Sequence, residues 1–200
     1  STLMRSSAAS DVYKRQVVFT AQLPDGINSR AFNDGEKAKV LKYAVYETGT
    51  KTVIYSSDQT DAPEANYSEM KFTLSLPLVK GQTYDLVFWA ESETTDGTTS
   101  PYTFTPSDQT IKINYTGIKC NDESRDAFFT SVTASTVTGA SQQSVQLYRP
   151  FAQLNIGTND LTVADRAGIK HKTTKVVVKD VYKTPVSYTH LRAHETELHL

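Results

Sequence analysis

The sequence predicts an all-β protein, an antiparallel β-sandwich with one short helix near residues 160–168. Several segments alternate apolar and polar residues with a period of two, the pattern of strands that bury one face. Tyr (11 residues) and Phe (8 residues) supply much of the apolar content, and aromatic residues favour strands. Long polar loops separate these segments, which suits a sandwich better than a tight up-and-down barrel.

The first predicted strand is VVFTAQL, residues 17–23. Its inward face carries four residues: Val17, Phe19, Ala21 and Leu23. The turn Pro24-Asp25-Gly26 ends the strand. A polar loop follows it and contains Arg30 and Ala31.

Further strands follow from the same alternation. We expect them at 40–49, 52–57, 70–79, 83–91, 110–117, 131–139, 144–158 and 173–183, with a short one at 102–104. The segment 57–68 is predicted to be a surface loop, and Pro77 indicates an edge or a strand end. In 144–158 the apolar phase shifts by one residue at Arg149-Pro150, which indicates a β-bulge. The helix at 160–168 begins at an Asp cap and ends at a Gly.

The two ends share no pattern with the middle. Residues 1–16 contain SAASDVYKRQ and residues 185–200 contain VSYTHLRAHET, and both strings resemble translated sequencing-adapter sequence. We therefore interpret the three histidines of the last segment as part of an artefact and not as a metal site. The natural part is then 17–184, expected to be one domain of a longer protein.

Composition and motifs argue against several functions. The formal net charge of −1 gives no reason to expect nucleic acid as a partner. The single cysteine, Cys120, excludes an intrachain disulfide. No apolar run approaches the ~20 residues of a membrane helix. No phosphate loop or catalytic signature is present, so we expect no enzyme, no cofactor and no metal.

Three groups of residues have a functional and a structural interpretation. The acidic segment 121–126 could be a calcium loop, although a solvated loop with an internal ion pair to Arg125 fits its spacing better. Glu91 and Glu93 lie on one face of a strand end and could be the carboxylate pair of a glycosidase, although any β protein provides such pairs by chance. Trp89 could stack on a sugar, but its apolar neighbours indicate a core position.

Three segments together resemble the amino-terminal domain of the fimbrillin-like proteins, the type V pilin subunits. They are LVFWAE (86–91), NDESRDAFF (121–129) and LYRPFAQLNIGTNDL (147–161). Within that group the sequence is most similar to a lineage catalogued as a domain of unknown function. The residues that carry the likeness are Trp89, Asp126, Phe128, Phe129, Arg149, Pro150, Phe151, Gln153 and Asn155.

The resemblance implies a transthyretin-like β-sandwich and a non-catalytic structural or adhesive role in a surface fimbria. It implies export as a lipoprotein to the outer membrane, with a lipid anchor and a second domain that this sequence does not contain. It also implies that a protease removes the first strand and that a strand of another fimbrial subunit replaces it. A host glycan or protein is a further expected partner.

On this interpretation Val17–Leu23 is the removable strand and Arg30-Ala31 is the processing site. The alternative for Arg30 is an ordinary solvated loop residue. The alternative for the whole protein is a cell-surface carbohydrate-binding sandwich module, with exposed aromatic rings such as those of Tyr102 and Phe104 on a loop.

Overall fold

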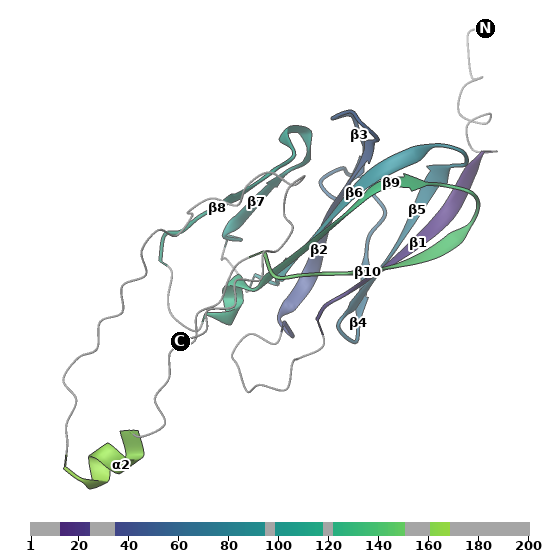
Figure 1. Cartoon of the computed structure of the whole chain (residues 1–200). Coiled ribbons are helices and arrows are strands. Elements are labelled where there is room, and N and C mark those ends of the chain that lie inside the picture. The colour runs from purple at the N-terminus through teal and green to yellow at the C-terminus, as the bar shows by residue number, and fades with distance from the viewer. Residues whose placement is uncertain (1–12, 25–34, 95–98, 118–121, 151–160, 169–200) are drawn as a thin grey trace, which may run out of the picture. The chain divides into compact units, whose positions relative to one another are not determined.

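The computed structural model describes residues 13–24, 35–94, 99–117, 122–150 and 161–168 (Figure 1). In these residues ten strands, two 3₁₀ helices and one short α-helix form. The strands are β1 (Lys14–Gln22), β2 (Ala38–Glu47), β3 (Val53–Ser56), β4 (Asn66–Ser68), β5 (Lys71–Val79), β6 (Thr83–Ser92), β7 (Tyr102–Thr105), β8 (Thr110–Ile113), β9 (Ala127–Thr136) and β10 (Ser141–Gln146). The helices are η1 (Pro106–Asp108), η2 (Glu123–Arg125) and α2 (Leu161–Arg166).

Two four-stranded sheets form the sandwich, and a two-stranded hairpin accompanies them. One sheet has the order β10-β1-β5-β4 and the other the order β3-β2-β6-β9, while β7 pairs with β8. The predicted all-β sandwich is therefore confirmed. One pairing departs from the predicted antiparallel arrangement, because β1 runs parallel to β10.

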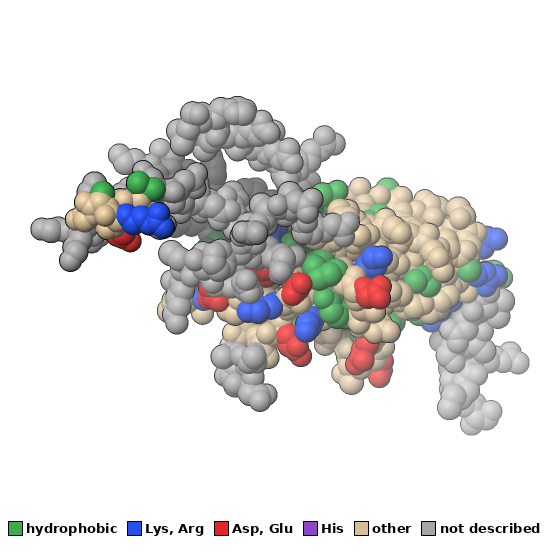
Figure 2. All heavy atoms as spheres, turned by 90° about the horizontal axis from the view of Figure 1, so that it is seen from below, with side chains coloured by type: hydrophobic (Ala, Val, Ile, Leu, Met, Phe, Trp, Pro, Cys, Tyr) green, Lys and Arg blue, Asp and Glu red, His purple; other side chains and the backbone are tan. Residues whose placement is uncertain are grey.

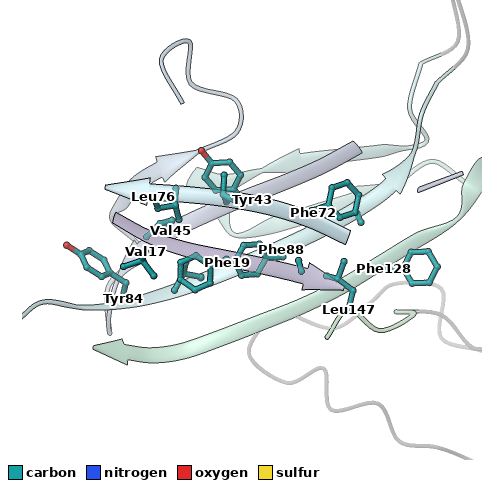
Figure 3. Close-up of a cluster of buried hydrophobic side chains, with 14 of the residues drawn as sticks. Val17, Phe19, Tyr43, Val45, Phe72, Leu76, Tyr84, Phe88, Phe128 and Leu147 are labelled. Carbon is teal, nitrogen blue, oxygen red and sulfur yellow. The ribbon is translucent and has the colours of Figure 1, made fainter. Parts of the chain in front are cut away.

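The main core lies between the two sheets, since strands with a period of two send alternate side chains inward. From the first sheet it receives residues of β1 and β5, such as Phe19 and Leu74. From the second it receives residues of β2 and β6, such as Tyr43 and Phe88. Figure 3 shows Phe19, Tyr43 and Phe88 among the side chains that converge from the two layers.

A second, smaller core covers the other face of the β3-β2-β6-β9 sheet. Val87 and Trp89 of β6 are buried there. Phe104, Ile111 and Ile113 of the β7–β8 hairpin pack against them. Strand β6, which matches the strand expected at 83–91, is thus buried on both faces, because it contributes to both cores.

Several predicted boundaries need correction. The strand expected at 144–158 begins at Ser141 and ends at Gln146, and the strand expected at 131–139 begins at Ala127. The loop expected at 57–68 contains β4. This short strand pairs only with Lys71–Thr73 of β5. On that side of β5 the backbone at Pro77 is therefore not paired with β4, which agrees with the edge position expected for a proline.

The strands belong to one compact unit, and α2 belongs to a second, Phe151–Pro185. Helix α2 confirms a short helix within 160–168. Three features of the sequence lie outside the described residues: the strand expected at 173–183, the phase shift after Pro150, and Cys120. Among the described residues, no helix has the length and apolar character needed to cross a membrane.

On the face shown in Figure 2, the coloured basic and acidic side chains are interspersed.

Candidate functional site

Strand β1 lies between β5 and β10 in the first sheet. We call this position, formed by the facing edges of β5 and β10 and by the core residues below it, the seat of β1. Along its full length it pairs antiparallel with β5, with Phe19 opposite Leu74. From Val17 to Gln22 it also pairs in parallel with β10. Both backbone edges of this part of β1 are therefore engaged, which is the position of a central strand.

The inward side chains of β1 fill the main core. Val17, Phe19, Ala21 and Leu23 are each at most 1% exposed, so the predicted inward face is confirmed. The ring of Phe19 lies 5.6 Å from that of Phe88 in the facing sheet, measured between centroids (Figure 3). The seat thus offers two rows of backbone hydrogen-bonding groups and an apolar floor, which together bind an extended strand.

The carboxyl end of β1 is fixed up to the predicted loop. The backbone N–H of Leu23 donates to the carbonyl of Met70 at 2.9 Å. The carbonyl of Gln22 accepts from the backbone N–H of Leu147 at 2.8 Å and from the side-chain amide of Gln146 at 3.0 Å. The strand therefore stays ordered to its last inward residue.

The loop that follows, including Arg30 and Ala31, lies outside the described residues. Its far flank is Gly35, which is buried and has a φ of 86°. A Cβ at this position would lie 2.9 Å from Cζ of Phe128, so the close approach itself requires glycine. The N–H of Ala38 donates to the carbonyl of Gly35 at 3.0 Å, which joins this flank to β2.

Three of the residues on which the predicted resemblance rests meet beside Gly35. Nη1 of Arg149 lies 2.9 Å from Oδ1 of the buried Asp126. The Arg149 guanidinium also sits over the ring of Phe128, with Cζ 4.6 Å from the ring centroid. The three residues therefore hold the chain after β10 against the start of β9. Sequence reasoning selected them through the resemblance but did not foresee that they touch.

The other motif residues have different positions. Trp89 is buried, and its ring meets Tyr102 edge to face at 5.0 Å, which confirms the predicted core role. Phe129 is buried, and its backbone exchanges hydrogen bonds with Tyr148 at 2.7 and 2.9 Å. Pro150 is half-buried. Phe151, Gln153 and Asn155 lie outside the described residues.

Glu91 is the centre of a buried polar network that the sequence did not reveal. Its carboxylate accepts from Nε1 of Trp89 at 2.8 Å and from Oγ of Ser100 at 2.8 Å. Nζ of Lys42 lies 2.8 Å from Oε1. Glu93 is exposed on the same strand end, so the two glutamates occupy different environments.

The expectation that Tyr102 and Phe104 are exposed is wrong. Tyr102 is only 6% exposed, and Phe104 packs against the second core. The reason is that β7 also has a period of two, so both rings lie on the face that covers β6. Burial raises the pKa of the Tyr102 hydroxyl, and the nearby Arg125 partly offsets this. The carbohydrate-binding alternative thereby loses the rings on which it depended.

The acidic loop before β9 contains the expected ion pair. Nε of Arg125 lies 3.7 Å from Oδ2 of Asp122. The same guanidinium donates to the carbonyls of Asn114 and Thr116, both at 2.7 Å, and so ties the end of the hairpin to this loop. Within the described residues, no three His, Cys, Asp or Glu side chains form a group that could hold a metal ion.

The fold and the seat of β1 define an all-β sandwich protein whose first described strand is a central strand of its sheet. The chain belongs to the family of unknown function DUF6562, whose model matches residues 9–195. The match extends into both segments that resemble adapter sequence. No curated protein and no solved structure matches the chain significantly. The fimbrillin-like relationship and the adapter origin of the ends stay predictions.

Proposed function

We propose that the protein is a non-catalytic structural or adhesive subunit of a bacterial surface fimbria that assembles by donor-strand exchange. The observation that supports it most is the seat of β1, which is bounded by backbone on two sides and by the core below. Strand addition uses these two features, since main-chain hydrogen bonds give affinity and side-chain pockets give specificity.

The energy available to such an exchange is large. A fully buried Phe or Leu side chain contributes roughly 1.5–3 kcal/mol relative to its exposed state. β1 buries Phe19 and Leu23 in addition to Val17. A strand from another subunit that restores these contacts would therefore bind firmly once β1 has left.

The location of the seat also suits processing. The strand is the first described element of the sandwich, and the loop after it contains Arg30 and Ala31. A cut there would separate β1 from β2 without interrupting any other described strand. Export as a lipoprotein, an outer-membrane anchor and a second domain belong to the same proposal.

The test is assembly after proteolysis. We expect the purified chain to form ladders of oligomers on native gels after treatment with an arginine-specific protease. Arg30→Ala should abolish the ladders, whereas Arg166→Ala, a change at an exposed position of α2, should leave them intact. Complete cleavage after Arg30 without any oligomer would contradict the proposal.

A further inference from the structure

We propose that cutting the loop after β1 does not empty the seat. The strand stays bound as a separate fragment and leaves only when another strand of the same pattern displaces it. This inference rests on the proposed function and concerns the control of the same site. It assigns the release of β1 to the incoming strand and not to the protease.

The contacts of β1 among the described residues lie outside the loop. The ladder with β5 runs from Lys14 to Gln22, and the ladder with β10 from Val17 to Gln22. The inward side chains pack against the facing sheet, as the pair Phe19–Phe88 shows. Hydrolysis of one peptide bond between residues 24 and 35 breaks none of these contacts.

Both flanks of the loop are fastened independently of it. On the near side, Leu23 is buried and donates its N–H to Met70. On the far side, Gly35 packs on Phe128 and accepts from Ala38. Each flank therefore keeps its anchors when the connection between them is cut.

An empty seat would be costly. Between β5 and β10 it would expose two rows of unpaired backbone groups together with the ring of Phe88, which is fully buried in the intact fold. An incoming strand avoids this state when it replaces β1 residue by residue, because most of the seat then stays covered throughout. The exchange is thus a competition between β1 and the donor.

The competition between β1 and the donor strand sets requirements for the sequence and direction of the donor. The donor must be an extended segment that runs parallel to β10 and antiparallel to β5 and places apolar side chains at the positions of Val17, Phe19 and Leu23. The position of Ala21 is buried to 1%, so the donor needs a small residue there to avoid overpacking.

The test uses the full chain with residues 27–31 replaced by the recognition sequence of a site-specific protease. After complete cleavage, native size-exclusion chromatography followed by mass spectrometry should show the fragment containing β1 in the peak of the monomeric body. A labelled synthetic peptide of residues 17–24 is then added. We expect the rate of fragment release to rise with peptide concentration.

Two variant peptides provide a matched comparison. Val17 is buried and its neighbour Val18 is half-buried on the opposite face. A Val17→Ser peptide should need roughly tenfold or more higher concentration than a Val18→Ser peptide to release the fragment at the same rate.

Each outcome decides something different. Loss of the fragment from the monomeric body without peptide, or a release rate that does not depend on peptide concentration, would overturn the inference while leaving strand exchange possible. A fragment that is retained and is never displaced at any peptide concentration would overturn both displacement and the proposed function. Equal activity of the Val17→Ser and Val18→Ser peptides would show that the side-chain pattern does not control the exchange, and would also overturn the inference.

Discussion

At the scale of single residues, adjacent positions on β1 have opposite environments. Val17 is 1% exposed and faces the core, whereas Val18 is half-buried on the outer face of the same sheet. Because Thr has nearly the shape of Val, replacing either residue by Thr adds a hydroxyl with little change in volume. The position of that hydroxyl then decides the effect on stability.

Val17→Thr should lower the free energy of unfolding by roughly 1–3 kcal/mol, since its hydroxyl enters an apolar core. Val18→Thr should change it by less than about 0.5 kcal/mol, the usual range of surface substitutions. Urea denaturation followed by tryptophan fluorescence measures both. Equal losses for the two variants would show that β1 does not face the core in this register.

The cluster of Arg149, Asp126 and Phe128 allows a second prediction. Arg149→Gln removes the cation beside a buried carboxylate, and we expect the free energy of unfolding to fall by roughly 1–3 kcal/mol. Arg149→Lys keeps the charge but loses the planar group over Phe128, so its loss should be smaller. Denaturant midpoints distinguish the two, and an unchanged midpoint for Arg149→Gln would contradict the assigned role of the pair.

At the scale of elements, the β7–β8 hairpin is fastened to the sandwich by polar contacts as well as by apolar packing. The Tyr102 hydroxyl donates to the carbonyl of Arg125, and Ser100 donates to Glu91 at 2.8 Å. The hairpin forms its own two-stranded sheet, and two-stranded hairpins have little stability by themselves. Its order therefore depends on these attachments.

Tyr102→Phe should increase amide hydrogen exchange in β7 and β8 while the amides of β1 and β5 keep their protection. The reason is that the lost hydrogen bond holds only the hairpin. Thr103→Ala, at an exposed position of the same strand, serves as the control and should leave exchange in the hairpin unchanged. Faster exchange in β1 would mean that the hairpin also supports the main core.

The strands also show which features of the fold the sequence alone predicts. The period-two pattern identifies β1, β5 and β6 because their inward residues are apolar and their outward residues are polar or shared with a second core. It does not identify which strands pair, so the parallel contact of β1 with β10 was not predicted. The pattern also led to the wrong prediction that Tyr102 is exposed. Its short strand lies between polar segments of the sequence, and only the structure shows that this strand covers another sheet.

The candidate site also contains features that the sequence predicts and features that it does not. The four inward residues of β1 follow from alternation alone, as does the core position of Trp89. The pairing of Arg149 with Asp126 joins positions 23 residues apart, and the network around Glu91 joins three separate segments. Such contacts depend on tertiary packing, which a single sequence does not encode in any local pattern.

At the scale of the whole molecule, buried tyrosines link stability to alkaline pH. Burial, and to a smaller extent Tyr55, raises the pKa of Tyr43 to about 12. Burial, and to a smaller extent Asp58, raises the pKa of Tyr46 to about 12. In the unfolded chain tyrosine has a pKa of about 10. Ionisation therefore favours the unfolded state first, and the stability present below pH ~10 is lost as the pH rises toward ~12.

We expect the free energy of unfolding to fall progressively over this alkaline range. Tyr46→Phe should make the fall shallower, although it also removes the hydrogen bond from the Tyr46 hydroxyl to the carbonyl of Pro106. Tyr148→Phe, at a side chain that is 59% exposed, is the control and should leave the slope unchanged. Denaturant titrations at a series of pH values measure these slopes, and a flat profile would contradict the burial of both rings.

The parallel ladder of β1 and β10 has a consequence for biosynthesis. The side chain of Gln146 bonds to the carbonyl of Gln22 across 124 positions of the chain. During translation, β1 emerges before β10, and until β10 follows one backbone edge of β1 is open. Contacts of such long sequence separation form slowly. The nascent chain is therefore exposed to wrong strand partners until β10 leaves the ribosome, and a chaperone that shields this edge would raise the yield of folded protein.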